Sequence, residues 1–109
     1  MRELWEILVP TKYGDTIKPI RTAHHKNWDK FVRKLTGGLT ILSPAKGSWV
    51  FNNTLFEERV IPVKISCTRK QLNSIVDFTL RHYRQKAVMA YKISNEVILK
   101  YGEGYEVQN

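Results

Sequence analysis

The sequence is poor in cysteine, and its apolar runs are short. Cys67 is the single cysteine among 109 residues, so no intramolecular disulfide can form and the small disulfide-stapled secreted domains are excluded. No apolar run approaches the roughly 20 residues that a membrane-spanning helix needs. Residues 1–6 include Glu3 and Glu6, acids at the place where a signal peptide would begin its apolar stretch. We therefore predict a cytoplasmic protein with no membrane partner.

Acidic residues are also scarce. The chain has 10 Asp and Glu against 18 Lys and Arg, a formal net charge of +8. Its 42% hydrophobic and 26% charged residues are typical of a globular protein and not of a disordered one. The length fits one domain, which we place at residues 1–101, followed by a flexible tail at 102–109. The excess of positive charge makes nucleic acid or an acidic protein possible partners.

Hydrophobic spacing predicts two helices. Trp28, Phe31, Val32 and Leu35 recur at i, i+3, i+4 and i+7, which indicates a helix over 22–35 that ends at two glycines. A second helix is expected from Thr68 to about residue 85. There the spacing of Thr68 and Gln71 is that of a capping box. Its buried stripe is predicted to be Leu72, Ile75, Val76, Thr79 and Tyr83.

The remaining apolar segments predict strands. We expect them at 3–9, 39–43, 48–51, 56–67, 87–93 and 96–101, with turns at 44–47, 52–54 and 94–95. Pro62 indicates a sheet edge or a bulge. The order β-α-β-β-α-β predicts an α+β fold, the ferredoxin-like βαββαβ sandwich, with an antiparallel sheet, two helices on one face and an extra C-terminal strand. A sheet with another strand order is the alternative.

The net positive charge lies in the two predicted helices. Residues 21–35 carry five bases and one acid, and residues 69–86 carry the same, so each segment contributes +4 and the rest of the chain is neutral. With both helices on one face, this side would be a basic layer able to contact phosphate groups. The expected contacts are Lys26, Lys30, Arg33, Arg69, Lys70, Arg81 and Arg84. The alternative is an ordinary solvated helix surface, partly placed to complement the helix dipoles.

Candidate catalytic residues are few. His24 shares the apolar stripe of the first helix and could act as a general base or a ligand, although core packing is the alternative. Glu57 and Glu58 are neighbours on a strand, so only one can face inward, where it could act as a base. A ligand pocket would bring His24 together with Trp49 and Tyr91. The sequence has no Gly-rich phosphate loop and no paired-cysteine or His-x3-His motif, so we predict no cofactor and no metal site.

Both faces of the predicted sheet carry apolar side chains. In residues 3–9, for example, Trp5, Ile7 and Val9 alternate with Leu4 and Leu8. One set packs on the helices, which leaves the other as an apolar open face that a monomer rarely exposes. We therefore expect a homodimer that forms through this face.

Several short motifs resemble a family of small bacterial domains of unknown function. They are Trp28-x-x-Phe31, Gly38-Leu-Thr-Ile41, Gly47-x-Trp49, Glu58 before a Val/Ile strand, and Gln85-x-Ala-Val88. The resemblance implies a ferredoxin-like α+β domain and no established activity. Members of that family often carry export signals, and residues 1–6 do not have that pattern.

These observations favour a small binding or regulatory module over an enzyme. The first alternative is a protein that binds nucleic acid through its two basic helices. The second is an enzyme with a pocket near His24, Trp49 and one of the two glutamates.

Overall fold

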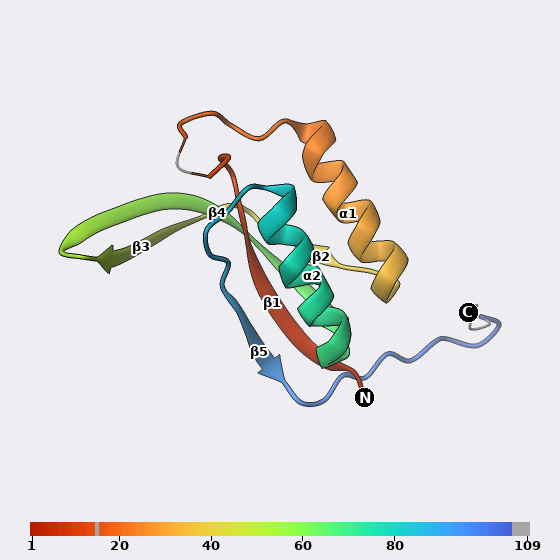
Figure 1. The fold of residues 1–109 in the computed structure, drawn as a ribbon. Helices are drawn as coiled ribbons and strands as arrows, with labels where there is room; N and C mark the ends of the chain where they lie inside the picture. Colours follow the sequence, from red (N-terminus) through yellow and green to blue (C-terminus); the bar gives the residue numbers. More distant parts are fainter. Residues whose placement is uncertain (15, 106–109) are drawn as a thin grey trace.

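The computed structural model describes residues 1–14 and 16–105, and its element order is β-α-β-β-β-α-β. The strands are β1 (Glu3–Pro10), β2 (Thr40–Ile41), β3 (Ala45–Phe51), β4 (Thr54–Cys67) and β5 (Ala90–Ser94), and the helices are α1 (Thr22–Thr36) and α2 (Arg69–His82) (Figure 1).

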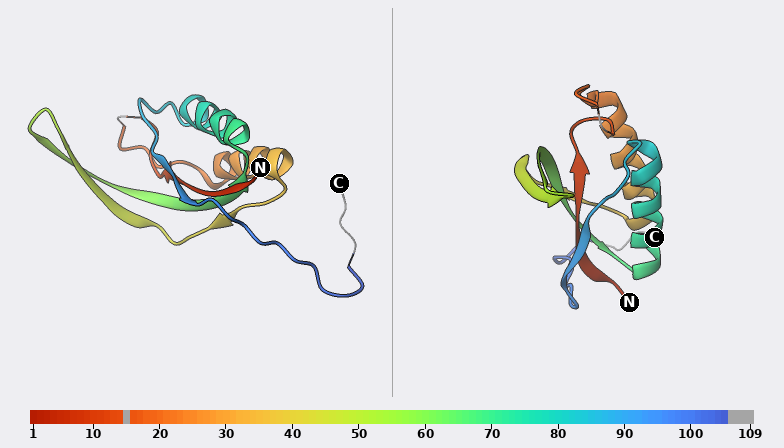
Figure 2. Two further views of the ribbon diagram at one scale, coloured as in Figure 1. Left: turned by 90° about the horizontal axis from the view of Figure 1, so that it is seen from below. Right: turned by 60° about the vertical axis from the view of Figure 1, so that its left-hand side comes forward.

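The strands form one antiparallel sheet in the order β2-β4-β1-β5, with β3 paired to the outer half of β4. Both helices cover the same face of this sheet, as the turned views in Figure 2 show. The prediction of a ferredoxin-like α+β sandwich is therefore confirmed. Its second strand is divided into β2 and β3, and the predicted turn at 44–47 is wrong because β3 already begins at Ala45.

Pro62 explains the division between β2 and β3. Its carbonyl oxygen accepts a hydrogen bond from the Leu42 backbone N–H at 2.9 Å. In a strand, the backbone N and O atoms of one residue point to the same side. The nitrogen of Pro62, which has no hydrogen to donate, therefore faces the gap between Ile41 and Ala45. The proline thus lies in a central strand at the point where the neighbouring strand is interrupted.

The expected C-terminal strand is not formed. Beyond Ser94 the described chain has no strand, and residues 95–105 run away from the sheet (Figure 2). A two-residue hairpin turn needs positive φ angles. Asn52 and Asn53 adopt them, at 51° and 60°, and close the β3–β4 hairpin, whereas Ser94 and Asn95 do not. Of the predicted flexible tail 102–109, residues 106–109 lie outside the described residues.

The core lies between the sheet and the helices. Trp5, Ile7 and Val9 of β1 point into it, while the intervening Leu4 and Leu8 are only partly buried on the open face. The helices contribute the predicted stripes, with Trp28, Val32 and Thr36 of α1 and Leu72, Ile75 and Thr79 of α2 buried. The Trp28 indole N–H donates to the Thr79 hydroxyl at 2.9 Å and links the helices inside the core.

The β3–β4 hairpin extends beyond the helices as an arm (Figure 1). We use the name arm for residues 45–59. Apolar side chains on both faces of it are exposed, among them Val50, Phe51 and Leu55, each at 60% or more of full exposure. No helix within the described ranges is long and apolar enough to cross a membrane.

Candidate functional site: a basic pocket at the helix ends

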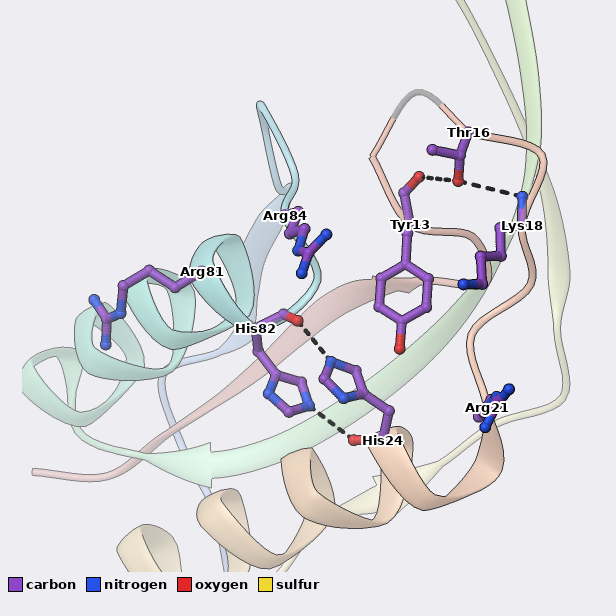
Figure 3. Close-up of a pocket in the computed structure, with 8 residues that line it drawn as sticks. All are labelled: Tyr13, Thr16, Lys18, Arg21, His24, Arg81, His82 and Arg84. Carbon is purple, nitrogen blue, oxygen red and sulfur yellow. Dashed lines mark hydrogen bonds between the residues drawn. The ribbon is translucent and has the colours of Figure 1, made fainter.

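A cavity of about 530 Å³ lies where the loop after β1 meets the start of α1 and the end of α2. Figure 3 shows the side chains that line it, with the His24 and His82 rings at the centre and Lys18 and Arg84 on either side of Tyr13. We call this cavity the basic pocket. Its lining residues are Tyr13, Thr16, Lys18, Arg21, His24, Arg81, His82 and Arg84.

The loop wall of the pocket is held by backbone hydrogen bonds. The Tyr13 N–H donates to the Lys18 carbonyl at 3.2 Å, and the Ile20 N–H donates to the Thr11 carbonyl at 2.9 Å. The side-chain amide of Gln85 donates to the Lys12 carbonyl at 3.1 Å and ties this loop to the end of α2. The backbone of Lys18 is therefore held against that of Tyr13.

The α2 wall ends in a Schellman motif. The Gln85 N–H donates to the Leu80 carbonyl at 3.0 Å, and the Arg84 N–H donates to the Arg81 carbonyl at 3.4 Å. The residue that this motif places in the left-handed region is usually glycine, but here it is Arg84, with a φ of 54°. An L-residue in this conformation costs roughly 1–2 kcal/mol. A strained residue that carries a charge into a cavity is typical of functional sites.

His24 and His82 form the floor of the pocket. Their rings are stacked with centroids 3.6 Å apart and planes 5° apart. His24 Nε2 lies 2.6 Å from the His82 carbonyl oxygen, and His82 Nε2 lies 2.8 Å from the His24 carbonyl oxygen. Because a carbonyl only accepts, both Nε2 atoms carry the proton and donate. The two helices are thereby joined by a reciprocal pair of hydrogen bonds.

The third histidine, His25, contacts the buried Tyr83. His25 Nδ1 lies 2.8 Å from the hydroxyl of Tyr83, whose side chain is fully buried. Burial raises the pKa of the Tyr83 phenol well above its ordinary value, so the hydroxyl keeps its proton and donates it to His25. Burial also lowers the pKa of His25, an effect that nearby Asp29 opposes. The pair of His25 and Tyr83 is thus neutral and joins the two helices.

Four cationic side chains line the pocket, and Figure 3 shows the Arg81 side chain pointing away from the two histidines. Within residues 1–14 and 16–105, Lys18, Arg21, Arg81 and Arg84 make no ion pair, and no described lining residue is a carboxylate. The start of α1 adds to this, because its first turn has no acidic residue and no side chain caps it. Arg81 also complements the negative end of the α2 dipole. This arrangement of positive charge favours the binding of an anion.

The seven predicted phosphate contacts are all exposed, but they do not form one site. Arg81 and Arg84 line the basic pocket. Arg69 lies at the opposite end of α2, about 18 Å away along the helix axis, with its guanidinium 5.4 Å from the centre of the Trp5 ring. The basic layer over the two helices stays a prediction; the basic pocket includes two of its seven residues, while Lys26, Lys30, Arg33 and Lys70 do not line the pocket.

The residues of the predicted ligand pocket lie on three separate elements. His24 lines the basic pocket, whereas Trp49 lies on the arm and Tyr91 on β5, and neither lines that cavity. The Tyr91 hydroxyl instead donates to the Glu6 carboxylate. The three residues are not brought together at this cavity, because a helix position and two strand positions far apart in the sequence can be placed together only when the tertiary arrangement is known.

Glu57 and Glu58 lie at a second cavity, of about 440 Å³, at the base of the arm. Glu57 forms an exposed ion pair with Lys46 at 3.3 Å. Glu58 faces the opposite side, across from Gly47 in the β3–β4 register. Burial raises the pKa of Glu58, and Lys12 opposes this shift. Neither glutamate lines the cavity of His24, so the predicted combination of a histidine and a glutamate is not assembled.

Of the eight lining residues, sequence reasoning predicted only His24, Arg81 and Arg84 as site residues. Tyr13, Thr16 and Lys18 belong to the loop at 11–20, which has no periodic pattern, and no local signal shows that Arg21 and His82 lie at the same cavity. Basic residues in the last turn of α2 and at the start of α1 indicated a site for negative charge. They lie far apart in the sequence, and only the antiparallel packing of the two helices brings them together.

The fold matches known structures although the sequence does not match known proteins. No family model and no curated protein sequence matches the chain. A divalent cation tolerance protein, CutA1, from Thermus thermophilus superposes with a TM-score of 0.64 at 10% identity, over 94% of this chain and 88% of that one. The periplasmic divalent cation tolerance protein CutA from Archaeoglobus fulgidus gives a TM-score of 0.66 at 14% identity, over 92% and 89%.

CutA1 from Oryza sativa is similar in the same way, with a TM-score of 0.62 at 10% identity over 94% of this chain and 83% of that one. At these identities the comparison establishes the ferredoxin-like fold and nothing about chemistry. Membership of the small bacterial family and a cytoplasmic location both stay predictions.

Proposed function

We propose that the chain is a small binding module whose ligand is an oxyanion or a phosphate ester held in the basic pocket. The observation that carries this proposal is the convergence on one cavity of four cations that pair with no described carboxylate. Guanidinium groups match the geometry of phosphate and sulfate oxygens, and their hydrogen bonds to charged acceptors are the strong ones. Binding is favoured over catalysis because the titratable groups at the centre, His24 and His82, are engaged with each other.

The size of the pocket supports a small molecule. A cavity of about 530 Å³ falls within the roughly 300–1,000 Å³ of typical ligand sites. The Tyr13 ring, 5.2 Å from the His24 ring, gives the pocket an aromatic wall beside its charges. An anion with a small organic group would use both features.

Calorimetric titration with pyrophosphate at low ionic strength tests this function. Replacing Arg84→Gln is expected to weaken binding roughly tenfold, the loss of one charge-assisted hydrogen bond. The matched control is Lys30→Gln, which removes an equal charge from the exposed face of α1 and should change the affinity less than twofold. If pyrophosphate fails to bind, or both variants lose equal affinity, the proposed function is wrong.

The same titration separates a small anion from nucleic acid. A duplex oligonucleotide held by the predicted helix contacts would bind through many phosphates, and its affinity would fall steeply with salt. We expect pyrophosphate to bind more tightly per charge than the oligonucleotide, because the cations surround a cavity instead of lining a groove. Tighter, salt-sensitive DNA binding that depends on Lys26, Lys30 and Arg33 would favour the alternative.

The arm favours a second property, self-association. Val50, Phe51 and Leu55 are exposed at 60% or more, on both faces of a hairpin that no helix covers. Monomers rarely expose apolar surface of this extent. The edge of β4 on the β1 side is also open over residues 54–59, since β1 pairs only from Val60 onward. We propose that a second copy of the chain covers the arm, in addition to the partly buried open face of the sheet.

Light scattering after size exclusion tests this association. The double variant Phe51→Ser with Leu55→Ser should yield monomers with an unchanged unfolding midpoint at low concentration, because both side chains are exposed in the single chain. Ile17→Ser, on an exposed loop residue outside both the arm and the sheet, is the control. A dimer that survives the arm variant, or one that dissociates equally on Ile17→Ser, would contradict an interface at the arm.

The names of the matched structures raise divalent-cation tolerance as a further candidate role. In the part of the chain that the structure describes, no group of three or more His, Cys, Asp or Glu side chains could hold a metal ion. We therefore propose that any such role depends on an anionic ligand and not on direct ligation. Tight binding of Zn²⁺ or Cu²⁺ to the purified chain would contradict this.

A further inference from the structure

We propose that the basic pocket takes up a proton together with its oxyanion, at the stacked pair of His24 and His82, so that its affinity increases as the pH falls. This inference rests on the proposed anion-binding function and adds the way in which that function is regulated. Its basis is the position of a stacked histidine pair at the floor of a cavity lined by four cations.

The hydrogen bonds fix where the proton can go. Each Nε2–H is donated to the backbone carbonyl of the other histidine, at 2.6 Å and 2.8 Å. Only the Nδ1 atoms can therefore gain a proton. Because the ring centroids are 3.6 Å apart, two imidazolium charges would repel strongly, so the pair is expected to accept one proton and not two.

The groups around the pair come from the loop after β1, from α1 and from α2. The loop presents Tyr13 and Lys18, α1 presents Arg21, His25 and Asp29, and α2 presents Arg81, Tyr83 and Arg84. Among these, Asp29 is the single carboxylate, and it acts on His25. Burial first, and the neighbouring His24 to a smaller extent, lower the pKa of His82, while its hydrogen bond to the His24 backbone opposes the shift.

An oxyanion reverses this balance. Its charge offsets the four cations and favours the protonated pair, which raises the pKa of the pair in the complex. By linkage, a ligand that promotes protonation binds more tightly when the proton is already present. Affinity must then rise as the pH falls through the histidine range, by up to about tenfold for a shift of one pKa unit.

Sulfate is the probe for this experiment, since it keeps its charge across the range from about pH 5.5 to about pH 8. Calorimetry in two buffers of different ionisation enthalpy gives the number of protons taken up on binding. We expect an uptake of roughly half a proton where the pH lies between the pKa values of the free and the bound pair, and an affinity roughly tenfold higher at the acid end. The double variant His24→Gln with His82→Gln keeps an N–H donor on each side chain and should flatten the pH dependence. His25→Gln is the matched control and should leave the pH dependence in place.

The outcomes separate this inference from the proposed function. Sulfate binding that depends on Arg84 but is independent of pH would overturn the proton coupling and leave the anion site standing. A pH dependence that persists in the double variant, or that disappears in His25→Gln, would also overturn it. No sulfate binding at any pH would overturn both. If the double variant does not fold, nuclear magnetic resonance titration of the wild-type imidazoles decides: sulfate must raise the pKa of His24 or His82, and an unchanged value contradicts the inference.

Discussion

Gly14 lies against the backbone of Arg84, so closely that a Cβ atom at position 14 would come within 2.9 Å of the Arg84 carbonyl oxygen. Both residues have positive φ angles, 45° for Gly14 and 54° for Arg84. The contact joins the loop after β1 to the end of α2, which are the two walls of the basic pocket. The pocket therefore depends on a glycine that makes no contact with a ligand.

Replacing Gly14→Ala should damage the pocket as well as the fold. The added Cβ combines an unfavourable φ with a contact to backbone that cannot move freely, so we expect a loss of more than about 2 kcal/mol in the free energy of unfolding. Gly37→Ala is the control, since Gly37 also has a positive φ but has nothing within 4 Å of the added atom. It should cost about 1 kcal/mol and leave sulfate binding intact. Urea denaturation and calorimetry measure both effects, and equal costs would show that the contact is unimportant.

Arg84→Gly should stabilise the protein while weakening its anion binding. Glycine adopts the left-handed conformation of the Schellman motif without the steric penalty that Arg84 carries. After the entropic cost of glycine in the unfolded chain, we expect a net gain of roughly 0.5–1 kcal/mol. A higher unfolding midpoint together with a lower sulfate affinity would show that the charge of Arg84 serves anion binding at a cost in stability. A variant that loses stability would mean that the arginine side chain holds the helix end in place.

Thr79→Val should destabilise the core by about 2 kcal/mol. The Thr79 hydroxyl accepts from the buried Trp28 indole N–H and donates to the Ile75 carbonyl. Valine has nearly the same shape but leaves that N–H without a partner, at the desolvation cost of one buried polar group. Thr79→Ser retains the hydroxyl and should preserve most of the stability. Denaturant unfolding compares the two variants, and equal losses would indicate that the methyl group matters and the hydrogen bond does not.

The fold should lose stability on acidification below about pH 6.5. Burial lowers the pKa of His25 and of His82 from the ordinary value of 6.5. The unfolded chain therefore binds protons first as the pH falls, so stability is fully present above the unfolded pKa and decreases from there toward the folded pKa values. Thermal unfolding between about pH 5.5 and about pH 8 follows this change. A His25→Gln variant should show a smaller decrease, and an unfolding midpoint constant over this range would contradict the assignment of neutral histidines.

Local patterns allowed the prediction of the elements with the strongest signals. The capping box of Thr68 and Gln71 is present with both hydrogen bonds, and the predicted helical stripes are buried except for Phe31, Leu35 and Val76, which are half-buried. The failures have tertiary causes. Residues 96–101 have strand composition, but Ser94 and Asn95 lack the positive φ angles that would turn the chain back. The turn expected at 44–47 was overridden because Ala45 pairs with Val60.

The candidate site was predictable only in part, because its two ends are far apart in the chain. His24 was identified from its position on the α1 stripe, but its partner His82 lies 58 residues away. Arg81 and Arg84 were identified as basic helix residues, whereas Lys18 sits in a loop whose path depends on contacts with Gln85 and Arg84. No local pattern encodes such a convergence.

The central claim is that anions bind at one pocket and not over the basic helices in general. The most direct measurement is a sulfate titration followed by nuclear magnetic resonance of the arginine side-chain Nε–H groups. We predict saturable shifts for Arg21 and Arg84, with Arg33 and Arg69 unaffected. Weak, unsaturated shifts of similar size at all four arginines would contradict the account.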